Sequence, residues 1–200
     1  MSIKIHYFHN PYKEINPKRR GELDYVYAEN MKVGFDYIHE IKGYPTFRKY
    51  FQHANHYIEL EKECDHITVF ANQDIAFPEN FISKILEHSK KDIALCLSRW
   101  NLEWERIKSK KTGKKIWKLF NRAGSQDTWI LYGIIKIPKS CDFQMGVPAC
   151  DKRIMYELKS NGYIIKNPSK SIKTLHIHNV KMPWAKKPLQ GKYHLCWPHE

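Results

Sequence analysis

Two short, largely apolar segments constrain the fold more than any other feature of this chain. Residues 67–71 (Ile-Thr-Val-Phe-Ala) and 93–97 (Ile-Ala-Leu-Cys-Leu) are each bounded by polar or turn-forming residues. Runs of this length and composition are typical of strands buried on both faces of a parallel sheet. The residues between them, 81–88, have helical spacing and follow Pro78-Glu79-Asn80. A strand, a helix and a second strand in this order predict a layered α/β fold.

The remaining pattern is consistent with one α/β domain over residues 1–200, with strands alternating with helices. We expect a three-layer sandwich in which a mixed, mostly parallel central sheet is flanked by helices. The pattern predicts strands at 3–8, 129–132, 163–165 and 172–178, with 134–137 continuing or bending the second of these. It also predicts helices at 22–41 (broken near Gly34) and 152–161, an irregular segment at 47–51, a basic turn around Thr112-Gly113, and an irregular tail from about 181.

Composition excludes several classes of protein. Hydrophobic residues make up 42% of the 200 residues, which is too many for a disordered chain. No apolar run approaches the roughly 20 residues of a membrane-spanning helix. The five cysteines are unclustered, so neither a disulfide framework nor a zinc ribbon is indicated. The first residues alternate like a strand and carry no signal-peptide pattern, so the expected location is the cytoplasm.

The net charge of +13 indicates attraction to anions. Nucleic acid, acidic membranes and phosphorylated small molecules are the candidate partners, and a basic surface that serves only solubility is the alternative. The sequence contains no helix-turn-helix, RNP or zinc-finger pattern, so nucleic acid is not the expected partner.

Asp74 is the sharpest candidate for a functional residue. It follows the strand at 67–71 directly, and ligands of open α/β sheets bind beyond the carboxyl ends of strands. In extended geometry Asn72 and Asp74 would share one face, where an amide oxygen and a carboxylate suit a hard divalent cation. Alternatively, Asp74 caps the turn or helix that follows.

The segment Thr174-Leu175-His176-Ile177-His178 supplies two histidines two positions apart. On a strand such residues point to the same side, so both His176 and His178 could reach one site. Combined with Asp74, they would form a carboxylate–imidazole site that suits Mn²⁺ better than Mg²⁺. Ordinary packing of either histidine, or contact with phosphate, is the alternative.

Two further carboxylates and one basic loop are candidates for other roles. Asp127 and Asp151 follow polar or Gly/Pro turns, and each could act as a general base or bind the acceptor, although Asp151 could simply cap a helix. Cys150 lacks a histidine partner in its sequence context and is expected to be buried. The loop after the first strand could hold a nucleotide base and diphosphate, or be an ordinary basic loop; it contains His9, Asn10, Tyr12, Lys13, Lys18, Arg19 and Arg20.

Four segments in this order resemble glycosyltransferases of the GT-A fold, and among them a small domain encoded by chlorella viruses. They are 68–77 (TVFANQDIAF), 125–129 (SQDTW), 145–154 (MGVPACDKRI) and 167–178 (NPSKSIKTLHIH). The first matches an apolar strand followed by a D-x-D-type motif, here with Asn72 in place of the first aspartate. The resemblance spans roughly residues 3 to 180.

The resemblance implies a nucleoside-diphosphate-sugar donor, UDP-linked, bound through Mn²⁺ or Mg²⁺, and a glycan hydroxyl as acceptor. Asp74 would be the principal metal ligand, assisted by His176 or His178. The nucleotide and sugar would be held by His9, Asn10, Tyr12, Arg19, Asn72, Gln73 and Arg99, with Asp127 and Asp151 as catalytic carboxylates. The alternatives are a basic nucleic-acid-binding module and a sugar-binding domain without catalytic activity.

Overall fold

The computed structural model describes residues 2–11, 14–107, 110–179 and 187–200, with the backbone alone for 104–107 and 110–112. These residues form a six-stranded mixed sheet in the order β2-β1-β3-β8-β5-β9. The strands are β1 (Ile3–His9), β2 (Tyr37–Glu40), β3 (Asp65–Ala71), β5 (Ile93–Leu97), β8 (Thr128–Tyr132) and β9 (Ile164–Lys166). Strand β1 is parallel to β2 and β3, β9 is parallel to β5, and β8 is antiparallel to both of its neighbours.

Alternate residues of the central strands divide between two hydrophobic clusters. Val69 of β3 and Leu95 of β5 belong to one cluster, whereas Phe70 and Cys96, one position later, belong to the other. Successive side chains of a strand point to opposite faces, so the two clusters lie on opposite faces of the sheet.

The described residues form four helices, α1 (Pro17–Asn30), α2 (Phe47–Leu60), α3 (Phe81–His88) and α4 (Cys150–Ser160). Helices α2 and α4 contribute to the cluster that contains Phe70, and α3 contributes to the cluster that contains Val69. Helix α1 reaches the Val69 side through Asn30, which donates a hydrogen bond to the Tyr7 hydroxyl. The sheet therefore has helices on both faces.

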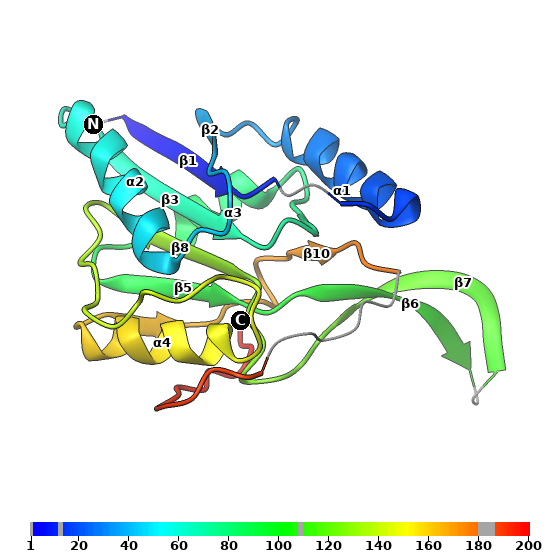
Figure 1. Cartoon of the computed structure of the whole chain (residues 1–200). Helices are drawn as coiled ribbons and strands as arrows, with labels where there is room; N and C mark the ends of the chain where they lie inside the picture. Colours follow the sequence, from blue (N-terminus) through cyan, green and yellow to red (C-terminus); the bar gives the residue numbers. More distant parts are fainter. Residues whose placement is uncertain (1, 12–13, 108–109, 180–186) are drawn as a thin grey trace.

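A second sheet has the order β4-β10-β6-β7. It contains β4 (Ile75–Ala76), β6 (Trp100–Ile107), β7 (Lys110–Leu119) and β10 (Leu175–His176). Strands β4 and β6 follow β3 and β5 closely along the chain, so this sheet lies beyond the carboxyl ends of those two central strands. Strands β6 and β7 form a long ribbon that projects from the body of the molecule (Figure 1).

Two of the predicted elements are wrong near the N-terminus. The helix predicted over 22–41 begins earlier, at Pro17, because Asn16 caps the amide groups of Lys18 and Arg19, and it ends at Asn30. The chain then turns at Gly34, whose φ is +92°, and residues 37–40 pair with β1 as β2. The irregular segment predicted at 47–51 is the start of α2, which Thr46 caps.

Other boundaries also differ from the sequence pattern. Thr112-Gly113, predicted as a turn, lies within β7; the connection between β6 and β7 at 108–109 is outside the described residues. Of the strand predicted at 172–178, only residues 175–176 pair with neighbouring strands, as β10. Residues 134–137 are not a strand, because Gly133, with φ +67°, ends β8. The strands at 67–71, 93–97 and 129–132 and the helix at 81–88 are confirmed, and Cys150 is buried as expected.

The C-terminal residues 187–200 contain neither helix nor strand and lie along the body of the domain. The amide groups of His194, Cys196 and His199 donate to the carbonyls of Lys152, Ala123 and Asn167 at 3.1, 2.8 and 2.9 Å. None of the helices in the described part of the chain has the length and apolar character that crossing a bilayer requires.

Three histidines of β1, β2 and β3 form a hydrogen-bonded chain within the sheet. His6 lies 3.0 Å from His39 and 2.9 Å from His66, and His66 Nε2 lies 2.8 Å from the carbonyl of Glu61. A carbonyl only accepts, so His66 Nε2 carries the proton, His6 donates to His66, and His39 donates to His6. Burial, with the neighbouring histidine charges, lowers the pKa of His6 to about 4, and burial likewise lowers the pKa of His39 to about 4.

We expect acid to destabilise the protein through this chain. Between pH 6.5 and about 4 the unfolded chain binds protons that buried His6 does not, so the free energy of unfolding falls as the pH falls, by about 3 kcal/mol for His6. Urea unfolding from pH 7.5 to 4 measures this loss. His6→Phe should make the profile shallower, with His39 still contributing, whereas the exposed control His56→Gln should not change it. An unchanged profile in His6→Phe would contradict the prediction.

Candidate metal centre

Asp74 lies in the tight turn that connects β3 to β4, at the carboxyl end of β3. The amide of Ile75 donates to the carbonyl of Asn72 at 3.1 Å, which closes the turn. Because residues 72–74 form a turn, Asn72 and Asp74 do not share an extended face as predicted. Asp74 does not cap α3 either, since the N-cap residue of that helix is Asn80.

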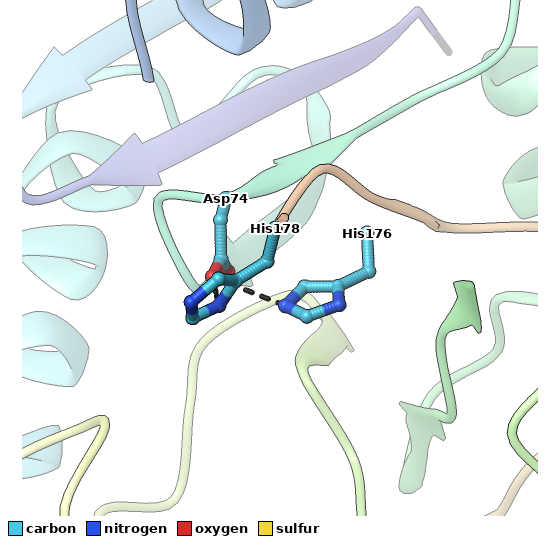
Figure 2. Close-up of side chains that lie close together, drawn as sticks. All are labelled: Asp74, His176 and His178. Carbon is cyan, nitrogen blue, oxygen red and sulfur yellow. Dashed lines mark hydrogen bonds and ion pairs between the residues drawn. The ribbon is translucent and has the colours of Figure 1, made fainter. Parts of the chain in front are cut away.

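The segment after β10 brings two histidines to this turn. The amide of Ile177 donates to the carbonyl of Asp74 at 2.9 Å, so the two residues that flank Ile177 lie on either side of that contact. His176 Nε2 is 3.1 Å and His178 Nδ1 is 3.3 Å from the same carboxylate oxygen, Oδ2 of Asp74. Figure 2 shows the three side chains pointing toward one another.

A buried arginine completes the surroundings of the carboxylate. Arg19 of α1 donates to Asp74 Oδ2 at 2.6 Å, to Glu22 at 2.8 Å and to the carbonyl of Ile177 at 2.9 Å. Burial alone would raise the pKa of Asp74, but the hydrogen bonds with His176 and His178 and the charge of Arg19 hold that pKa well below its usual range. Asp74 is therefore a carboxylate, although its side chain is only 14% exposed.

The protonation pattern of His176 follows from its other neighbour, Asn101 of β6. Arg99 Nε, which can only donate, lies 3.2 Å from Asn101 Oδ1, so that atom is an acceptor. His176 Nδ1 lies 3.0 Å from the same oxygen and must donate to it. In a neutral ring, Nε2 then presents a lone pair to the Asp74 carboxylate. Two acceptors at this distance require either a protonated ring or a cation that both can bind.

The three side chains fit a divalent cation. Their ligand atoms all lie within 4.8 Å of one another. Adjacent ligands of an octahedral ion with bonds of about 2.1 Å lie about 3 Å apart, close to the separations of both histidine nitrogens from Asp74 Oδ2. Asn101 fixes Nε2 of His176 as the coordinating nitrogen, in the manner of the outer hydrogen bonds that orient histidines in metal sites. One carboxylate with two imidazoles suits Mn²⁺ better than Mg²⁺.

A second carboxylate, Asp127, lies immediately before β8. Because β8 is antiparallel to β3 and β5, its start lies at their carboxyl ends. Arg99 Nη1 is 3.1 Å from both carboxylate oxygens of Asp127, and Asn72 Nδ2 donates to it at 2.8 Å. Asp127 is only 6% exposed and is paired with a cation, which suits positioning of Arg99 better than abstraction of a proton.

Asp151 has a different environment, in the first turn of α4. Ala149 is the N-cap residue and forms no side-chain cap, so Asp151 is not the predicted cap; it accepts instead from the amide of Lys152 at 2.9 Å. Burial, helped by the negative charge of Asp127, raises the pKa of Asp151 to about 6 despite that amide contact. A carboxyl group that titrates near neutrality has the property of a general base.

The residues predicted to hold the nucleotide are not gathered in one exposed loop. His9 is buried at the end of β1, and Asn10 donates to the carbonyls of Ile41 and Gly43, which ties down the loop that follows β2. Arg19 belongs to α1 and donates to the Asp74 oxygen that both histidines contact. Gln73 shares the turn with Asp74, and Tyr12 lies outside the described residues.

A cavity of about 430 Å³ opens beside the two histidines. His176, His178, Arg99 and Asn101 line it together with Tyr25 and Trp117. Sequence patterns missed Asn101, Glu22, Tyr25 and Trp117, because each acts through a neighbour that only the folded chain supplies. Asn101 lies on β6, where the pattern predicted no strand, and Trp117 lies on β7, close to the basic turn predicted around Thr112-Gly113.

Comparisons with solved structures add a weak likeness. No protein-family model and no curated protein matches this chain. One solved structure, described as a glycosyltransferase involved in the glycosylation of the major capsid of PBCV-1, matches with a TM-score of 0.43 and 12% identity, over 90% of this chain and 95% of that one. A match at this level carries no argument about fold or function.

Proposed function

We propose that this protein is a metal-dependent glycosyltransferase with a GT-A-like three-layer fold. It transfers a sugar from a nucleoside-diphosphate sugar, UDP-linked, to a glycan hydroxyl. Mn²⁺ or Mg²⁺ would be held by Asp74, His176 and His178. The ordered motifs of the sequence support the class of reaction, and the geometry around Asp74 supports the metal.

One observation carries the proposal: the partly buried Asp74 carboxylate at the carboxyl end of β3 lies 3.1 Å from Nε2 of His176, whose Nδ1 donates to Asn101. In the neutral ring Nε2 carries a lone pair, so a cation or a proton is needed between that nitrogen and the carboxylate, even though Arg19 already pairs with Asp74. A divalent cation bound there would neutralise the charge that develops on a departing diphosphate. The adjoining cavity, with Arg99 on its wall, has room for the donor beside that cation.

Other residues of the chain would position the metal ligands, contact the donor and accept the proton of the acceptor. Arg19 holds Asp74 in place through its ion pair, and Asn101 holds His176 through a hydrogen bond. Asp127 orients Arg99 toward the cavity, where its guanidinium can donate to hydroxyl or phosphate oxygens. Asp151, with its raised pKa, is the candidate to accept the proton of the acceptor hydroxyl.

Calorimetric titration of UDP tests the proposal directly. We expect saturable binding in the presence of Mn²⁺ and its loss when EDTA replaces the metal, since the diphosphate is held through the cation. GDP, ADP and CDP under the same conditions identify the base preference, because they differ from UDP in the nucleoside and keep the diphosphate. Absence of binding for every nucleotide, with Mn²⁺ and without it, would refute the proposed donor class.

A further inference from the structure

A second cavity continues from the candidate metal centre and extends the site. It has a volume of about 520 Å³ and shares Tyr25, Trp117 and Ile177 with the cavity beside the histidines. The two cavities are therefore neighbouring parts of one groove, which we call the ribbon groove. Each is within the range of small-molecule sites, roughly 300–1,000 Å³.

The walls of the ribbon groove come from α1 and from the β6–β7 ribbon. Trp117 of β7 is paired across the ribbon with Leu102 of β6, and both side chains line the groove. Tyr25 of α1 lines it as well and is 53% exposed. Exposed aromatic rings on a groove wall provide flat apolar faces, and the C–H faces of sugar rings pack on such surfaces.

The charges of the distal cavity favour a neutral ligand. Among the described residues that line this cavity, Lys32 carries the positive charge, and it is paired with Glu29 at 2.7 Å. Glu79 adds a further carboxylate. A polyanion such as nucleic acid needs unpaired lysine and arginine along its path, and this cavity offers the reverse despite the net charge of +13.

Amide side chains supply the remaining polar groups. Asn101 and Asn179 line the part beside the histidines, and Asn80 lines the distal part. Amides both donate and accept hydrogen bonds, as hydroxyl groups do. Aromatic faces with amides and internally paired charges are the chemistry that recognises a neutral polyhydroxyl chain.

We propose that the ribbon groove binds a neutral oligosaccharide, the acceptor, with its reacting end at the metal centre and its remaining units on Trp117 and Tyr25. The identification of this ligand as an acceptor rests on the proposed function; binding of the oligosaccharide does not. The groove continues past the histidines by a whole second cavity, so the preferred ligand is a chain of several sugars and a single sugar should bind weakly.

Saturation-transfer NMR on the metal-free protein in EDTA tests this inference. The probes are cellohexaose, maltohexaose, xylohexaose and mannohexaose, their monosaccharides, and two polyanions, a heparin hexasaccharide and a 12-nucleotide oligothymidylate. We expect saturable binding of at least one neutral hexasaccharide, with its monosaccharide at least about tenfold weaker. Failure of all four hexasaccharides, or competition for the groove by either polyanion, would overturn the proposal.

Variants locate the binding. Trp117→Ala should weaken the hexasaccharide at least about tenfold and Trp117→Phe should retain most of the affinity, because a phenyl ring keeps an aromatic face. Tyr25→Ala is a second test that does not depend on the ribbon, and Trp197→Ala, whose side chain is 63% exposed in the C-terminal segment outside the groove, is the control. Equal affinity in Trp117→Ala, Tyr25→Ala and Trp197→Ala would place the sugar elsewhere and overturn the proposal.

The two proposals fail separately. Hexasaccharide binding without any UDP binding would leave a sugar-binding groove and remove the transferase. Mn²⁺-dependent UDP binding without any hexasaccharide binding would retain the proposed function and remove the groove as an acceptor site.

Discussion

Asp74→Asn is expected to abolish metal-dependent nucleotide binding while leaving the protein folded. The amide has the shape of the carboxylate but lacks its charge, and Mn²⁺ affinity depends on that charge. We expect Mn²⁺ affinity, measured by electron paramagnetic resonance of the free ion, to fall by about 100-fold or more. UDP binding in Mn²⁺ should fall to the level that the wild type shows in EDTA.

The fold should tolerate this change because Arg19 keeps a second anionic partner. Glu22 remains 2.8 Å from the guanidinium when the Asp74 charge is removed, so the buried arginine is not left without a counter-ion. Glu87→Gln, which removes an exposed carboxylate of α3 paired with Lys84, is the control for loss of one negative charge. Equal Mn²⁺ affinity in Asp74→Asn and Glu87→Gln would remove Asp74 as a metal ligand.

Asn101→Leu is expected to have a Mn²⁺ affinity between that of the wild type and that of Asp74→Asn. It removes the acceptor that holds the proton on Nδ1 of His176, so Nε2 is no longer fixed as the lone pair facing Asp74. Loss of such an outer hydrogen bond typically lowers metal affinity 10- to 100-fold. The expected order of Mn²⁺ affinity is wild type, then Asn101→Leu, then Asp74→Asn. If His176 instead pairs with Asp74 as a proton carrier, Asn101→Leu leaves Mn²⁺ affinity unchanged.

The sequence could predict that Asp74, His176 and His178 are candidates for one site because the determinants of their placement are local. An apolar strand that ends in a polar turn places Asp74 at a sheet edge, and two histidines two positions apart share one side of an extended segment. The two histidines reach the turn although only residues 175–176 form a ladder, since the amide of Ile177 donates to the carbonyl of Asp74 and holds the segment beside the turn. The partners of these side chains, Arg19 and Asn101, are distant in sequence, and no spacing rule connects them to Asp74.

The elements that the sequence pattern predicted wrongly also have specific causes. Helical spacing of apolar residues continues past Asn30, but Gly34 needs a left-handed backbone and the residues after it pair with β1, so tertiary pairing decides between helix and strand. Helix α2 has the weak helix formers His53 and His56 at exposed positions, so its sequence does not indicate a helix, whereas Phe47, Phe51 and other residues of its inner face pack in the core and stabilise it. Thr112-Gly113 has the composition of a turn, yet Gly113 adopts φ +83° inside β7.

Asp151→Asn is expected to raise the stability of the protein and to remove transfer. Burial raises the pKa of Asp151 to about 6 from 3.8, so the ionised side chain is less favourable in the folded protein than in the unfolded chain. The folded state therefore binds the extra proton between pH 3.8 and 6, and stability is lost as the pH rises through that window. At pH 8 the neutral amide avoids this cost, and the free energy of unfolding should increase by about 1–3 kcal/mol relative to the wild type.

Asp151→Asn should increase stability but lower the rate of transfer. A general base acts in its ionised form, so the wild-type rate with the UDP-sugar donor should fall as the pH drops through about 6, and Asp151→Asn should lower the rate about 10²- to 10⁴-fold and remove that pH dependence. The exposed Asp142→Asn is the control for both measurements. A carboxylate that only supports the start of α4 would give the reverse pair of results, a less stable variant with a nearly unchanged rate. Gain of stability together with loss of transfer is expected only if the fold keeps an unfavourable charge at this position for use in the reaction.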